Sequence, residues 1–60
     1  MKATVEFSYG IGTRVTIKDI GLRGTVIAML FNAQGPQYQV TWFSDSQRRR
    51  EWLFEFEVTP

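Results

Sequence analysis

The sequence predicts a small all-β domain of about five strands, closed into a barrel or bent into a strongly curved sheet. Apolar and polar residues alternate in several short runs, which is the period of a strand with one buried face. β-branched and aromatic residues are abundant, and turn-forming residues separate the runs. No segment longer than a single turn has helical periodicity.

The sequence of the N-terminal third predicts a strand over residues 14–18 and allows a further one before it. The segment 1–8 contains an alternating run, and we expect it to be either an extra strand of the barrel or an arm that pairs with another copy. A glycine-containing turn over residues 9–13 leads to a strand over residues 14–18. In that strand Val15 and Ile17 face the core.

The second long strand is expected over residues 24–31. It follows a loop at residues 19–22, in which Gly21 suits a positive φ. The apolar residues of this strand do not alternate strictly, because Val26 and Met29 both have the character of buried residues. This pattern predicts a β-bulge between them.

A hairpin joins this strand to the third one. Residues 32–37 are expected to close the hairpin, with the Gly-Pro pair as the turn signal. In the third strand the core-facing residues are Tyr38, Val40 and Trp42, and the opposite face carries Gln39, Thr41 and Phe43.

The last arm follows a polar turn at residues 44–47. Trp52 and Phe54 fall on one face of this arm, because they are two positions apart. Residues 55–57 predict a single 3-10 turn, and residues 58–59 predict a short final strand.

The charge balance argues against a protein that binds nucleic acid through bulk charge alone. Seven basic and six acidic side chains give a net charge of +1, although a local basic patch can still bind. Cysteine and histidine are absent, which excludes disulfides and the common zinc ligand sets, and no cofactor is expected. No apolar run has the length of a membrane span, so we expect one stand-alone domain, 1–60, in the cytoplasm and without a membrane partner.

The first candidate site is the run of three arginines. Arg48 and Arg50 point to the same side of a strand and Arg49 to the other, so at most two of them share a face. Lys18 and Arg23 extend the patch if their loops lie nearby. The planar arginine side chain suits phosphate, which it can bind through two parallel hydrogen bonds.

The alternative is that the run is a solvated strand start, as most charge runs are. Asp45, Glu51 and Glu55 lie close to it in sequence and would then neutralise it. Exposed ion pairs of this kind contribute little to stability.

The aromatic residues of the second half are too many for one small barrel to bury. We expect Trp52, Phe54 and Phe56 to be the exposed rings. They are either harmless, or a stacking platform for bases, or a contact for a cation. Together with the face of Val5 and Phe7, they could instead be covered by a second copy of the chain in a homo-oligomer.

No residue pattern predicts catalysis. Histidine and cysteine are absent, and no serine has a base partner in sequence. The regular spacing of Glu51, Glu55 and Glu57 is typical of solvent-side charges. We therefore expect no catalytic residue, no metal site and no enzyme.

Several short motifs mark turns and core positions along the chain. They are Tyr9-x-Ile11-Gly12-Thr13-x-Val15-x-Ile17, Gly24-x-Val26, Tyr38-x-Val40-x-Trp42, Arg50-x-Trp52 and Glu55-x-Glu57-Val58. In their spacing the chain resembles the SH3-like barrel superfamily, and most nearly its KOW-, Tudor- and agenet-type barrels, which occur in short bacterial and phage proteins. The resemblance covers residues 9–58 and implies an SH3-like barrel of about five strands with a single 3-10 turn before the last strand.

A second set of motifs, Gly12-x-Arg14-Val15-x-x-Lys18 and Tyr38-x-Val40, is similar to the framework of type II dihydrofolate reductases. Those enzymes are SH3-like barrels that assemble as tetramers around a pore. The Val-Gln-Ile-Tyr strand that lines their pore has no match at residues 50–53, so this activity is a remote alternative.

We therefore expect a non-enzymatic binding module that contacts an acidic partner, either a nucleic acid or a protein, through the basic and aromatic last hairpin. The alternative is a small homo-oligomeric interaction or structural protein that buries its aromatic face. The expected binding residues are Arg48, Arg49, Arg50, Trp52, Phe54, Phe56, Lys18 and Arg23.

Overall fold

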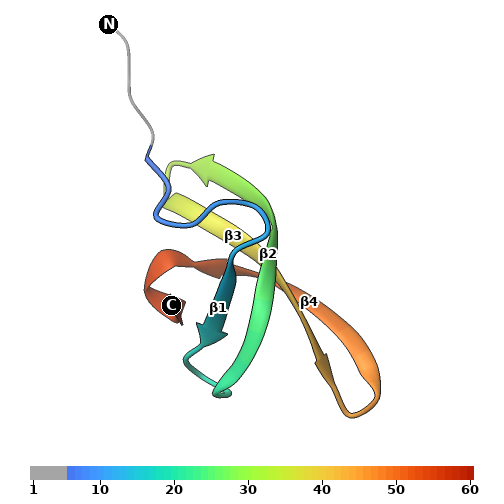
Figure 1. Ribbon diagram of the computed structural model, residues 1–60. Helices are drawn as coiled ribbons and strands as arrows, with labels where there is room; N and C mark the ends of the chain where they lie inside the picture. The colour runs from blue at the N-terminus through green and yellow to red at the C-terminus, as the bar shows by residue number, and fades with distance from the viewer. Residues whose placement is uncertain (1–5) are drawn as a thin grey trace, which may run out of the picture.

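The computed structural model describes residues 6–60, which form one antiparallel sheet of five strands (Figure 1). The strands are β1 (Arg14–Ile17), β2 (Leu22–Asn32), β3 (Gly35–Ser44), β4 (Gln47–Phe54) and β5 (Val58–Thr59), with a 3-10 turn η1 (Glu55–Glu57) before β5. Their order in the sheet is β4-β3-β2-β1-β5, so the last strand returns to pair with the first. The all-β class and the 3-10 turn before the last strand are confirmed.

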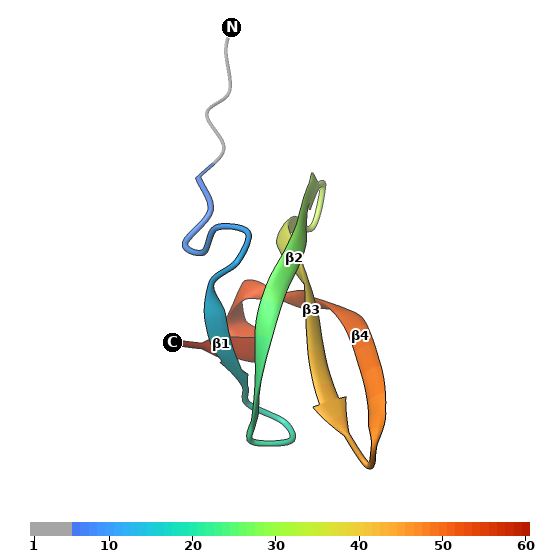
Figure 2. The ribbon, with the colours of Figure 1, turned by 45° about the vertical axis from the view of Figure 1, so that its right-hand side comes forward.

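The sheet is curved but does not close into the expected barrel (Figures 1 and 2). β4 and β5 are its two edges, and no ladder joins them within residues 6–60. β5 has only two residues, and both pair with β1.

The predicted strand or arm over residues 1–8 falls largely outside the described residues. Glu6 and Phe7 belong to no strand. Phe7 packs edge-on against the Tyr38 ring, with 5.8 Å between the ring centroids, and is half-buried. Phe7 therefore packs against the core, so its ring is not a fully exposed surface that a second copy would have to cover. Val5, the other member of the expected exposed face, lies outside the described residues.

β2 contains the irregularities that its sequence predicts. The register shifts between Val26 and Ala28, which confirms the β-bulge. Gly21 has the expected positive φ, +68°, in the β1–β2 turn. At Gly24, a Cβ atom would lie 2.6 Å from the backbone oxygen of Thr41, so only glycine allows β2 to lie this close to β3.

The hairpin expected over residues 32–37 is confirmed, but its two turn residues are Ala33 and Gln34, and the Gly-Pro pair belongs to β3. Gly35 pairs with Asn32 as the first residue of β3 and has φ +105°. The Asn32 side-chain oxygen accepts a hydrogen bond from the Gln34 N–H at 2.9 Å. This hydrogen bond gives the Gln34 N–H a partner within the turn, so the chain reverses ahead of Pro36.

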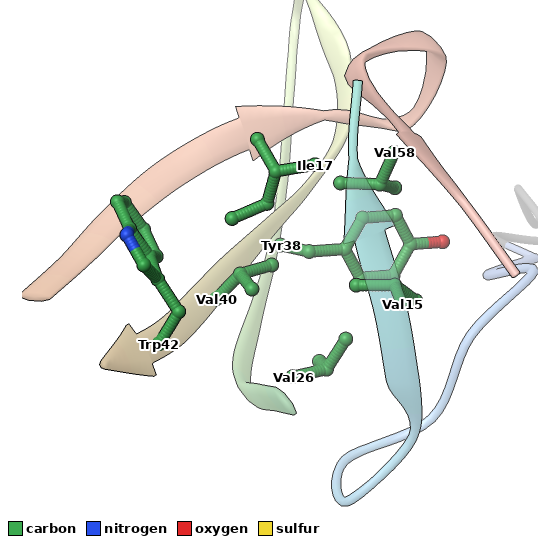
Figure 3. Packing of buried hydrophobic residues seen from close by; sticks show 7 residues of the cluster. All are labelled: Val15, Ile17, Val26, Tyr38, Val40, Trp42 and Val58. Carbon is green, nitrogen blue, oxygen red and sulfur yellow. The ribbon is translucent and has the colours of Figure 1, made fainter. Parts of the chain in front are cut away.

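The core lies on one face of the sheet, where side chains from four strands meet (Figure 3). Its members are Val15, Ile17, Val26, Tyr38, Val40, Trp42 and Val58. The inward positions predicted for β1 and β3 are therefore confirmed. Met29 is partly buried against this cluster, as the position of the bulge requires.

Candidate functional site

The arginine run alternates across β4, as its spacing predicts. Arg48 lies opposite Phe43 in the β3–β4 ladder, Arg49 lies opposite Trp42, and Arg50 lies opposite Thr41. Residues directly opposite each other in an antiparallel pair share a face of the sheet. Since Trp42 belongs to the core, Arg49 lies on the core side, and the other two arginines lie on the outer face.

Two further arginines reach the same outer face from neighbouring strands. Thr41 of β3 pairs with Thr25 of β2, which in turn pairs with Arg14 of β1. Arg23 is the preceding outward position of β2, and its Nη1 donates a hydrogen bond to the Thr16 hydroxyl oxygen at 3.1 Å. We call the outer surface that carries Arg14, Arg23, Arg48 and Arg50 the arginine face.

The arginine face is hollowed where β2 and β3 separate. Their ladder stops at the Thr25–Thr41 pair, and from there the β3–β4 hairpin runs away from β2 (Figures 1 and 2). The hollow has a volume of about 290 Å³. Its lining residues are Arg14, Arg23, Gly24, Thr25, Thr41, Trp42, Phe43 and Arg48. None of these residues has a carboxylate, so three guanidinium groups line one open space without a counter-charge among its walls.

The acidic residues that would neutralise the arginine run lie elsewhere. Glu51 pairs with Val40 and therefore lies on the core side. Glu55 accepts a hydrogen bond from the Tyr38 hydroxyl at 3.2 Å. Asp45 lies in the turn of the β3–β4 hairpin and is not among the lining residues. None of these three acidic residues therefore lines the hollow, and none of them neutralises its arginines there.

Two exposed rings share this outer face. Phe43 is 63% exposed, and the guanidinium carbon of Arg48 lies 5.8 Å from the centre of its ring. Trp52 is 43% exposed, which confirms its predicted exposure, and it follows Arg48 and Arg50 in the outward row of β4. Exposed rings and positive charges therefore lie side by side on one surface, where they can contact a ligand that has both π faces and negative charge.

The residues that line the hollow differ in part from the residues expected to bind. Phe43 and Arg14 line the hollow although neither was expected to bind. The alternation of their strands places both side chains on the outer face, and this is the sequence signal that could have identified them. Of the two residues expected to extend the arginine patch, Arg23 lines the hollow and Lys18 does not. Lys18 follows β1, and its backbone N–H donates a hydrogen bond to the Glu57 carbonyl oxygen at 3.0 Å.

Phe54 and Phe56 belong to a different surface at the other end of β4. Their rings stack with centroids 5.5 Å apart and an interplanar angle of 6°. Phe56 is 72% exposed, as expected, whereas Phe54 is half-buried because Phe56 covers it. Together with Gln34, Pro36 and Glu55 these rings line a hollow of about 350 Å³, which we call the phenylalanine hollow.

The expected single surface on the last hairpin is thus two surfaces. Arg48 and Phe54 are six positions apart on β4, which corresponds to roughly 20 Å along a strand. One small ligand group cannot contact both ends. The arginine face and the phenylalanine hollow are therefore two separate candidate sites.

Other kinds of site are not found in the described part of the chain. Within residues 6–60, no group of three His, Cys, Asp or Glu side chains is arranged to hold a metal ion. In the same range, no helix is long and apolar enough to cross a membrane. No protein-family model, curated protein or solved structure matches the chain.

Proposed function

We propose that this chain is a non-enzymatic binding module that holds a nucleic acid on its arginine face. The observation that carries the proposal is the hollow in which Arg14, Arg23 and Arg48 meet from three different strands with no carboxylate in its lining. Guanidinium groups bind phosphate oxygens through charge-assisted, frequently bidentate hydrogen bonds. A phosphodiester supplies the missing counter-charge.

The exposed rings favour nucleic acid over an acidic protein surface. Phe43 and Trp52 lie among the arginines, and bases offer flat π faces beside each phosphate. Asp and Glu side chains on a protein would bind the arginines but offer no π face for the rings, whereas every nucleotide carries a phosphate and a base together. With a net charge of +1, the chain makes only a few phosphate contacts, so binding is moderate in affinity and sensitive to salt.

We also infer that the sheet is an opened relative of the SH3-like barrels, and most nearly of the KOW and Tudor types. The strand order β4-β3-β2-β1-β5 and the 3-10 turn before the two-residue last strand support this assignment. In such an arrangement the outer face of β2, β3 and β4 stays free to bind.

The binding proposal is tested by fluorescence anisotropy with a labelled oligonucleotide of about 12 nucleotides over a range of salt concentrations. On a single strand, the logarithm of the affinity should fall with the logarithm of salt by about 0.7 per phosphate contact. The double variant Arg48→Ala, Arg50→Ala should make this slope shallower by up to about 1.4.

The chain offers a matched control for charge. Arg49→Ala removes one positive charge, as Arg48→Ala alone or Arg50→Ala alone does, but from the core side of the same strand, and it should leave the salt slope close to that of the unmodified protein. The proposal is wrong if the chain binds no oligonucleotide, or if Arg49→Ala changes the salt slope as much as Arg48→Ala and Arg50→Ala each do.

A second candidate function is self-association through the phenylalanine hollow. Phe56 is 72% exposed and stacked on Phe54, and large exposed rings of this kind are typical of contact surfaces. Light scattering at micromolar concentrations should then give a mass larger than one chain, and Phe56→Ser should restore the mass of a single chain. A single-chain mass for the unmodified protein excludes this candidate and leaves the arginine face unaffected.

A further inference from the structure

We propose that the nucleic acid held on the arginine face is single-stranded, with unpaired bases stacked on the exposed rings; this inference rests on the function proposed above. One phosphate lies in the hollow with Arg14, Arg23 and Arg48. One base lies against Phe43 at the rim of that hollow. The strand then follows β4 towards Trp52.

The exposed rings are the first argument for a single strand. Phe43 and Trp52 present exposed ring surface on the same side of the sheet as the arginines. In a duplex each base is already stacked on both faces, so its π surface is not available to a protein ring. Only an unpaired base can cover these rings, and every base can do so, because stacking is tolerant of sequence.

The spacing along β4 is the second argument. Arg48, Arg50 and Trp52 are successive outward positions, so their Cα atoms follow one another at intervals of roughly 6.6–6.8 Å. This step is close to the distance between neighbouring phosphates in an extended single strand. The row can therefore follow one sugar-phosphate backbone, with arginines beside phosphates and a ring at the end beside a base.

The shape of the hairpin is the third argument. A two-stranded ribbon can enter the major groove of a duplex, and β3 with β4 forms such a ribbon. Its tip, however, carries Asp45, whose carboxylate would approach the duplex phosphates first. The arginines lie instead on the flat side of the ribbon, continuous with β1 and β2. This arrangement suits a strand laid across the sheet and disfavours insertion into a groove.

The single-strand inference is tested with unmodified protein and four labelled probes of equal length, about 12 units each. They are a homothymidine strand, a homouridine strand, a duplex, and a strand of abasic sites that has the phosphates but no bases. We expect the homothymidine and homouridine strands to bind about tenfold or more tighter than the abasic strand and than the duplex. DNA and RNA strands are compared directly, since both offer the same phosphates and stackable bases.

Ring variants give the second arm of the experiment. Phe43→Leu and Trp52→Leu should each weaken binding of the homothymidine strand by about tenfold. Phe31→Leu is the matched control, because Phe31 is a similarly exposed ring on β2 that does not line the hollow. Circular dichroism verifies that each variant is folded.

The outcomes separate this inference from the function on which it rests. If the abasic strand or the duplex binds as tightly as the homothymidine strand and binding still depends on Arg48 and Arg50, the single-strand inference is overturned and the nucleic-acid function stands. If Phe43→Leu and Trp52→Leu bind like Phe31→Leu, base stacking is overturned in the same way. If no probe binds, both the function and the inference are overturned.

Discussion

The Tyr38 hydroxyl donates a hydrogen bond to Glu55 Oε1 at 3.2 Å and so links the middle of the sheet to the 3-10 turn before the last strand. The same oxygen accepts the Ser8 N–H at 2.9 Å, which ties the segment before β1 to β3. Burial raises the pKa of the Tyr38 hydroxyl above its ordinary value, and the nearby Glu55 carboxylate raises this pKa further. The hydrogen bonds from the Tyr9 and Ser8 backbone N–H groups lower the pKa and offset part of the rise.

This environment predicts a loss of stability in alkali. The pKa of the Tyr38 hydroxyl is raised in the folded state, so its contribution to stability is fully present below the unfolded pKa of about 10 and is lost as the pH rises through the folded pKa. Urea unfolding measured at pH values from about 8 to about 11 should show this fall.

Two variants isolate the contribution of Tyr38. Tyr38→Phe should lose about 1–2 kcal/mol at neutral pH, because the Ser8 N–H and Glu55 lose a partner, and its decline above pH about 10 should be less steep. Tyr9→Phe should keep the steep decline. Equal slopes for Tyr38→Phe and the unmodified protein would show that Tyr38 is not the group responsible.

Gly24 is predicted to be the glycine least tolerant of substitution on steric grounds. A Cβ there would lie 2.6 Å from both the Thr41 backbone oxygen and Val40 Cγ1, so β2 and β3 would have to move apart at the edge of the hollow. We expect Gly24→Ala to lower the free energy of unfolding by about 1–3 kcal/mol. Gly10→Ala is the control, since the nearest atom to its Cβ is 4.0 Å away, and denaturant titration of the two variants compares them directly.

The turn between β3 and β4 offers a stabilising substitution. Asp45 and Ser46 have φ of 52° and 61°, a combination that a two-residue hairpin turn of type I′ requires and that glycine adopts without steric cost. Ser46→Gly should therefore raise the free energy of unfolding by about 1 kcal/mol. Thermal unfolding should show a higher Tm, and a lower Tm would mean that the Ser46 side chain makes a contact that outweighs the strain.

Much of the fold could be predicted because its signals are local. Alternation places Val15 and Tyr38 in the core, and the break in alternation after Val26 marks the bulge. The β2–β3 hairpin lies in the expected range, residues 32–37, but its turn precedes the Gly-Pro pair, where the Asn32 side chain accepts a hydrogen bond from the Gln34 backbone N–H.

The site could be predicted only in part, because it depends on register. Arg48 and Arg50 were identifiable from their run, and their outward positions from the strand period. Arg14 lies on the same hollow although it is distant in sequence, and only the pairing of β1 with β2 and of β2 with β3 brings it there. No local sequence pattern specifies how the strands pair. For the same reason the sequence places Phe43 on the outer face of its strand but does not show that it lines the hollow.

The arginine face predicts opposite effects of one substitution on stability and on binding. Thr25 lies between Arg14 on β1 and Thr41 on β3 and lines the hollow, so Thr25→Glu places a carboxylate among like charges that repel one another. Compared with the uncharged variant Thr25→Gln, we expect Thr25→Glu to gain about 0.5 kcal/mol of stability at low salt, and to lose that gain at high salt. Binding of an oligonucleotide should weaken at least about tenfold for Thr25→Glu, because the carboxylate occupies the place of a phosphate. If instead both stability and binding fall together, the substitution disrupts the fold, and if binding is unchanged, the hollow does not hold the phosphate.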